Sequence, residues 1–211
     1  HLASAAIMRE RRGPEHPDVA SGLTSAAFAV QSQGRLAEAE SLYRAALAIR
    51  EKVLGGDHPE TARTHMNLGW LLHDLGRYAE ALDEAAVVLA QRKAFGDGHP
   101  AVGSTLIMRG QSLLRLDRVR EAEAAFRDAL AIREQGLPAG HWLIAATRSA
   151  LGEALAVQRR YAEAEQLLLA ALEVLRKERG EEQELTRLAK TRLVMLYERW
   201  GKLAEAAKYR P

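Results

Sequence analysis

Two short motifs recur along the chain at nearly the same interval. A His-Pro step follows a glycine at three places, with 42 residues from Pro17 to Pro59 and 41 from Pro59 to Pro100. A degenerate fourth copy, AGHWLIA, places His141 42 residues after His99. A metal site, a set of catalytic histidines and a structural repeat could each account for this spacing.

The second motif keeps the same period. Copies of a sequence related to GRLAEAE start 42, 41, 42 and 42 residues apart, at Gly34, Gly76, Asp117, Arg159 and Gly201. The histidine of each unit precedes its copy by 18 residues, at His16, His58, His99 and His141. Two independent motifs with one period indicate an array of repeats, in which each unit packs on its neighbours.

Each repeat has the sequence pattern of two helices. In the second unit, apolar and small residues recur at three- and four-residue steps over 59–75, as on a helix with one buried face. Gly76 can end this helix in a left-handed conformation, and a second helix is expected over about 78–95. Pro59 suits the first position of a helix, where it loses no hydrogen bond. We therefore interpret His58 as the residue that marks the turn into the helix.

The sequence thus predicts an all-α fold, an array of antiparallel helix pairs that forms a single domain over residues 1–211. The expected elements are a lone helix at 2–12, full repeats at 17–54, 59–95, 100–135 and 141–179, and a partial repeat at 184–209.

One position in the repeat is reserved for small residues. Gly69, Gly110 and Gly152 share it, Ala27 fills it in the first repeat, and Val194 breaks the pattern in the last. A small residue lets the two helices of a pair approach closely, and overpacking such a site costs about 1–3 kcal/mol. We therefore expect Gly69→Leu to be severe. His58→Ala should cost about 0.5 kcal/mol or less, as at an ordinary surface site.

Composition narrows the classes of function. The chain has 30 basic and 28 acidic residues, a formal net charge of +2 and no block of one sign, so no nucleic-acid partner is expected. It contains no cysteine, which removes disulfides and thiolate chemistry and fits a reducing, cytoplasmic location. No apolar run approaches the ~18 residues of a membrane span, so no membrane partner is expected.

The recurring histidines are poor candidates for a metal site. Zinc requires imidazole nitrogens at about 2.0–2.1 Å from one ion, whereas packed helices of successive repeats are separated by about 8–10 Å. The sequence also lacks HExxH, GxSxG and phosphate-loop motifs. We expect no metal, no cofactor and no enzymatic activity.

The motifs resemble those of tetratricopeptide repeats. The small residues after the turn, as in GRYAEA at 76–81, are similar to that family. The 42-residue period, with GDHPETA before the first helix and ALAIREKVLG at 46–55, resembles the kinesin-light-chain variety, which is longer than the common 34-residue unit. The C-terminal segment RLVMLYERWGKLAEAAKYR resembles tetratricopeptide tails of bacterial serine/threonine kinases.

The resemblance implies a right-handed superhelical array of antiparallel helix pairs, a tetratricopeptide-like solenoid, with a concave groove lined by the first helix of each repeat. Groove positions carried over from the family predict a peptide-binding surface made by Phe28, Arg63, Met66, Asn67, Trp70, His73, Met108 and Gln111. Phe28, Trp70 and Met108 would form a mildly apolar floor suited to adaptable peptide contacts. Phe28, Trp70 and Gln111 share one repeat position and are expected to form a row. The alternative is that some of these side chains pack between helices.

Two functions stay open at this point. The first is a non-catalytic protein-interaction scaffold that takes an extended or helical peptide of a partner protein in its groove. The alternative is a regulatory or oligomerisation segment of a larger signalling enzyme, such as a bacterial serine/threonine kinase. The exposed ends of the array could also mediate self-association.

Overall fold

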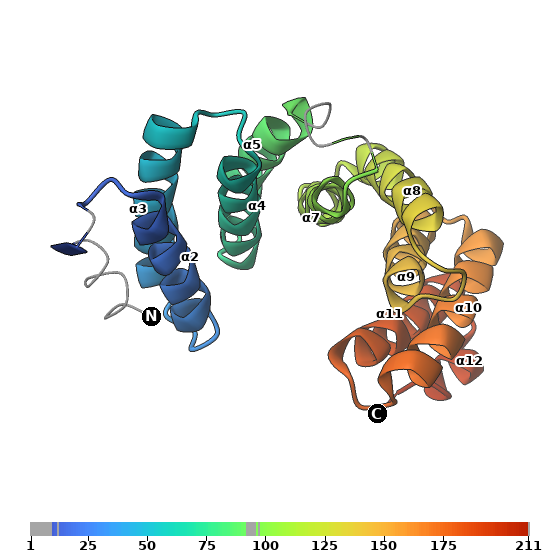
Figure 1. The fold of residues 1–211 in the computed structure, drawn as a ribbon. Helices are drawn as coiled ribbons and strands as arrows, with labels where there is room; N and C mark the ends of the chain where they lie inside the picture. Colours follow the sequence, from blue (N-terminus) through green and yellow to red (C-terminus); the bar gives the residue numbers. More distant parts are fainter. Residues whose placement is uncertain (1–9, 12, 92–95, 97, 211) are drawn as a thin grey trace. The chain divides into compact units, whose positions relative to one another are not determined.

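The computed structural model describes residues 10–11, 13–91, 96 and 98–210. All regular elements in this part of the chain are α-helices, and they follow one another in pairs (Figure 1). The predicted all-α class is therefore confirmed. None of the described helices is long and apolar enough to cross a bilayer. The lone helix predicted at 2–12 falls almost wholly outside the described residues.

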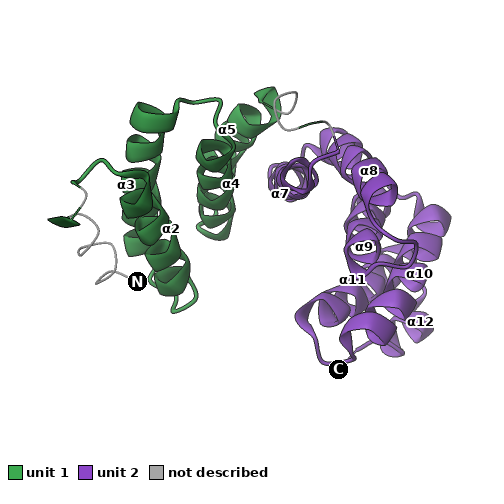
Figure 2. Ribbon diagram, in the orientation of Figure 1, with its two compact units in different colours: residues 1–97 green, residues 98–211 purple. Residues whose placement is uncertain are grey.

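Two compact units make up the chain, residues 1–97 and residues 98–211, and each is described by itself (Figure 2). The paired helices of unit 1 are α2 (Pro17–Gln31), α3 (Leu36–Leu54), α4 (Pro59–Asp74) and α5 (Tyr78–Ala90). Helix α2 packs on α3 and α4 packs on α5, while the contact between α3 and α4 joins the first repeat to the second. Residues 92–95, predicted as the end of the second repeat, lie outside the described part.

Unit 2 continues the same pattern. Its helices are α7 (Pro100–Arg115), α8 (Val119–Gly136), α9 (Trp142–Val157), α10 (Tyr161–Arg179), α11 (Glu184–Trp200) and the short α12 (Leu203–Ala207). The pairs are α7 with α8, α9 with α10 and α11 with α12. The first helices of unit 2 also contact one another, α7 on α9 and α9 on α11. That the two units act as one array stays a prediction.

The small-residue position brings the helices of a pair into close contact. A Cβ atom added to Gly110 on α7 would lie 2.4 Å from Cε1 of Phe126 on the partner helix α8. A Cβ atom on Gly152 of α9 would lie 2.7 Å from Cγ of Leu168 on α10. Both distances are well inside van der Waals contact, so the predicted need for a small residue is confirmed at these two positions.

Four helices begin with the same histidine cap. The ring Nδ1 atom of the histidine accepts a hydrogen bond of 3.1–3.2 Å from the backbone N–H two residues further on, at His16, His58, His99 and His141. The first N–H groups of a helix have no partner within the helix, and a capping side chain supplies one. The histidine therefore does more than mark a turn. The sequence interpretation missed this role because histidine is not among the usual capping residues.

This cap changes the expected effect of His58→Ala. Loss of an N-cap costs about 0.5–2 kcal/mol, so we expect the free energy of unfolding to fall by about 1 kcal/mol rather than 0.5 or less. His58→Asn keeps a side chain that can accept the bond, and it should recover most of the loss. Urea denaturation followed by circular dichroism measures both variants. Equal losses for Ala and Asn would show that the capping bond contributes nothing.

Candidate functional site

The predicted groove residues of unit 1 all keep exposed surface. The exposed or half-buried side chains are Phe28, Arg63, Met66, Asn67, Trp70 and His73. Phe28 on α2 is exposed over 69% of its surface, far more than a packed aromatic residue would be. Trp70, at the same repeat position on α4, is half-buried. Unit 1 therefore presents two aromatic side chains from its two first helices.

Neighbouring rings hold Trp70 in place. The His73 ring meets Trp70 edge-on, with 6.0 Å between ring centroids and 79° between planes. The His73 ring also lies 5.3 Å from the ring of Tyr78, the first residue of α5, measured between centroids. Such arrangements are favoured for aromatic pairs. Trp70 thus contacts His73, which in turn contacts Tyr78 of the partner helix, a role of Tyr78 that the sequence did not suggest.

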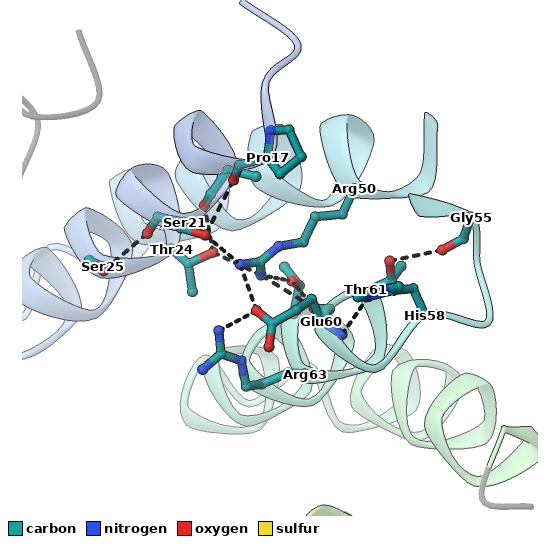
Figure 3. A network of polar contacts seen from close by, with 12 residues as sticks. Pro17, Ser21, Thr24, Ser25, Arg50, Gly55, His58, Glu60, Thr61 and Arg63 are labelled. Carbon is teal, nitrogen blue, oxygen red and sulfur yellow. Dashed lines mark hydrogen bonds and ion pairs between the residues drawn. The ribbon is translucent and has the colours of Figure 1, made fainter. Parts of the chain in front are cut away.

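A buried arginine joins the two first helices of unit 1. Arg50 on α3 is only 1% exposed, and Figure 3 shows its guanidinium group among side chains of α2 and α4. Its Nη1 atom donates to the hydroxyls of Thr24 on α2, at 3.2 Å, and Thr64 on α4, at 2.5 Å. Its Nη2 atom donates to the Ser21 hydroxyl at 3.3 Å. A single side chain therefore joins α2 to α4, the helices that carry Phe28 and Trp70.

One carboxylate compensates this buried charge. Nη2 of Arg50 donates to Oε2 of Glu60 at 3.1 Å, and Nη1 donates to the Glu60 carbonyl oxygen at 3.3 Å. Burial lowers the pKa of Arg50, the Glu60 carboxylate opposes that shift, and the positive charge of Arg63 adds to it. Arg63, a predicted groove residue, donates to the same Glu60 oxygen. Two guanidinium groups and one carboxylate thus lie at one end of the α2–α4 surface (Figure 3).

A hydrogen bond joins α2 to α4 at the other end of this surface. The Nε2 atom of Gln31, the last residue of α2, donates to Oδ2 of Asp74, the last residue of α4, at 3.2 Å. The stretch between this bond and the Arg50 cluster holds Ser25 and Phe28 on α2 and Asn67 and Trp70 on α4. We call it the α2–α4 surface.

In unit 2, the burial of one predicted groove residue differs from the sequence prediction. Met108 is fully buried, so its predicted place on the floor of the groove is wrong. Met108 packs inside unit 2, in agreement with the alternative that some of these side chains pack between helices. Gln111 is half-buried in unit 2. At the repeat position of Asn67, α11 carries a buried Arg192, whose Nε donates to Oε2 of Glu153 at 2.5 Å.

The sequence contains a signal for the arginine that was missed. Ala-Ile-Arg-Glu occurs at 48–51 and again at 131–134, which places Arg133 at the repeat position of Arg50. Both arginines interrupt the apolar face of a second helix. A charged residue repeated at a core position is a candidate for a buried, hydrogen-bonded role.

Comparisons with known proteins agree on the family. The tetratricopeptide repeat model matches residues 18–94 and 143–209, and a second model of the same description matches residues 102–143. No curated protein has a matching sequence.

Several solved structures share the fold. The nearly identical tetratricopeptide-like repeats assigned to a kinesin light chain of Podosopora anserina are 22% identical, with a TM-score of 0.77 over 92% of each chain. BtubC (BKLC) of P. vanneervenii is 18% identical, with a TM-score of 0.78 over 99% of this chain and 83% of that one. YrrB is 17% identical, with a TM-score of 0.59 over 98% and 88% of the two chains. Since the matched segments cover most of its length, the chain belongs to the tetratricopeptide repeat family.

Proposed function

We propose that this chain is a non-catalytic protein-interaction scaffold that binds a peptide segment of a partner on the α2–α4 surface of unit 1. Tetratricopeptide repeats support an interaction scaffold as the general function. YrrB, which shares the fold, is described as a tetratricopeptide protein with an unusual peptide-binding site. The observation that carries the proposal here is the pair of aromatic side chains, Phe28 and Trp70, presented at one repeat position on two tied helices.

The aromatic pair supplies apolar contact area. Single exposed apolar residues are common on protein surfaces, but the 69% exposure of Phe28, at the repeat position that Trp70 fills on α4, is not explained by packing. Tryptophan is among the residues most enriched where a few side chains carry most of the binding energy. Trp70 needs less ordering on binding than a free side chain, because its ring already contacts His73, which itself packs on Tyr78.

Polar side chains on the same surface suit a peptide backbone. Asn67, one turn before Trp70, is half-buried and carries an amide that can donate and accept at once. Ser25 on α2 is exposed, and its hydroxyl donates to the Ser21 carbonyl oxygen while its lone pairs can accept. The surface therefore offers both kinds of hydrogen-bonding group to an extended or helical segment.

The test is Trp70→Ala. We expect the variant to keep its helix content, because the ring is only half-buried, and to bind a peptide selected on the wild-type chain about 30-fold more weakly. That factor corresponds to about 2 kcal/mol, the usual loss at an anchor residue. Calorimetry gives the affinity and circular dichroism the helix content. Leu169→Ala, which truncates a 38% exposed leucine on α10, serves as the control and should bind normally.

Two results would contradict the proposal. Unchanged affinity of the Trp70→Ala variant would place the binding surface elsewhere. Loss of helix content would show that Trp70 belongs to the core. The alternative function, a regulatory segment of a larger signalling enzyme, stays a prediction from the resemblance of the C-terminal segment.

A further inference from the structure

Arg133 of unit 2 repeats the contacts of Arg50. It lies on α8, 83 residues after Arg50 on α3. Its Nη1 atom donates to the hydroxyl of Thr147 at 2.5 Å and to the carbonyl oxygen of Leu143 at 3.0 Å. Both acceptors are on α9, the first helix of the following repeat. The chain thus builds the same arginine contact in each unit.

The two contacts differ in how the charge is compensated. In unit 1, Oε2 of Glu60 accepts from Arg50 at 3.1 Å. The residue 83 positions after Glu60 is Leu143, whose side chain is uncharged. Across the described ranges, no carboxylate pairs with Arg133, and burial alone lowers its pKa to about 10. Unit 2 therefore holds a partly buried cation whose charge is not balanced by an acidic side chain of those ranges.

Small residues lie on α7 near Arg133 or at repeat positions that surround the arginine in unit 1. The Nε atom lies beside Gly103 of α7, 3.8 Å from the place where a Cβ atom would be. The next residue, Ser104, is half-buried and occupies the repeat position of Ser21, which accepts from Nη2 of Arg50. Ala146 stands where unit 1 has the bulky Arg63. On α9 a small residue thus stands where unit 1 has a charged neighbour of the arginine, while the serine on the preceding first helix is shared by both units.

We propose that Arg133 binds the carboxylate of an Asp or Glu side chain in a partner peptide, at the position that Glu60 fills within unit 1. The planar guanidinium matches a carboxylate with two parallel donors, and such charge-assisted bonds are short and strong. The carboxylate of the peptide would then balance the charge of Arg133, as Glu60 balances that of Arg50 in unit 1. The inference rests on the proposed function only in taking the ligand to be a peptide, since the two sites lie in different units.

The experiment compares two pools of capped dodecapeptides that are random except for a fixed central Glu or Gln. The full chain should retain the Glu pool about tenfold more strongly than the Gln pool, which is about 1.4 kcal/mol. Leu143→Glu supplies the internal carboxylate and should abolish this preference, whereas Leu143→Gln, of matched size, should keep it. Arg133→Leu copies Leu175, the residue at this position in the fourth repeat, and should also abolish it.

Equal retention of the two pools by the wild-type chain would overturn the inference. So would a preference that survives in both Leu143→Glu and Arg133→Leu, provided that circular dichroism shows both variants folded. If the wild-type chain captures the Gln pool and the Trp70→Ala variant does not, the proposed function holds even where the acidic preference fails.

If neither pool binds, the proposed function fails, and acetate then tests Arg133 alone. An acetate-dependent shift of the Arg133 Nε–H NMR signal, absent in Leu143→Glu, would support the carboxylate site. No shift in the wild-type chain would overturn it.

Discussion

Gly110→Leu should lower the free energy of unfolding of unit 2 by about 3 kcal/mol, the upper range for an overpacked core. A Cβ atom alone would stand 2.4, 2.7 and 2.8 Å from three atoms of the Phe126 ring. That ring is fully buried, so it cannot swing aside into solvent. The paired helices α7 and α8 would have to separate to admit the new side chain.

The same exchange in the partner helix provides the control. Gly136, at the end of α8, would present its Cβ atom to open space, with no atom within 4 Å. Gly136→Leu should therefore change the free energy of unfolding by no more than about 0.5 kcal/mol. Urea denaturation of both variants decides the matter. A Gly110→Leu protein as stable as Gly136→Leu would show that α7 and α8 are not as close as the structure has them.

Arg50→Met should lower the free energy of unfolding of unit 1 by about 2 kcal/mol. Removing one partner of a buried ion pair costs about 3–5 kcal/mol when the other charge is left fully buried. The Glu60 side chain is 39% exposed and can turn partly to water, so the smaller value applies. The hydroxyls of Thr24 and Thr64 lose their shared donor in the same step.

A second arginine on α3 serves as a control that separates the effect of burial on stability from the effect of charge. Arg44 on α3 pairs with Glu40 at 2.8 Å, but its side chain is 48% exposed. Exposed pairs contribute about 0–1 kcal/mol, so Arg44→Met should cost at most about half as much as Arg50→Met. Equal losses, measured by denaturation, would mean that the buried network adds nothing beyond an ordinary surface pair.

The fold was predictable from the sequence because its signals are local and repeated. Period, proline position and small residues such as Gly110 each specify backbone geometry, and several copies of a signal support one another. The histidine caps and the buried Arg50 were not predicted. Average tendencies place arginine at the surface, and only the acceptors from α2 and α4 make its burial tolerable.

Side-chain exposure in the groove was harder to predict than the helices. Asn67 and Met108 share one repeat position, yet Asn67 is half-buried and Met108 is fully buried. In unit 2 the first helices contact each other directly, α7 on α9 and α9 on α11, and Arg192 at this position bonds Ser149 and Glu153 of α9. Ala150 and Arg192, at the same position on α9 and α11, are buried as well. Repeat positions carried over from a family do not predict how tightly the first helices of neighbouring repeats pack.

The arginine contacts also bear on how such a chain can be divided or recombined. Arg50 belongs to one repeat, while Thr64 and the Glu60 carboxylate belong to the next, and Arg133 and Thr147 stand in the same relation. A cut between repeats therefore separates the buried arginine from its partners on the following repeat, although Ser21 and Thr24 stay with Arg50. The smallest interchangeable module at Arg133 is a second helix together with the first helix that follows it, and at Arg50 the module also includes α2. Grafts and truncations whose ends respect that boundary should stay soluble where those cut at the repeat boundary would not.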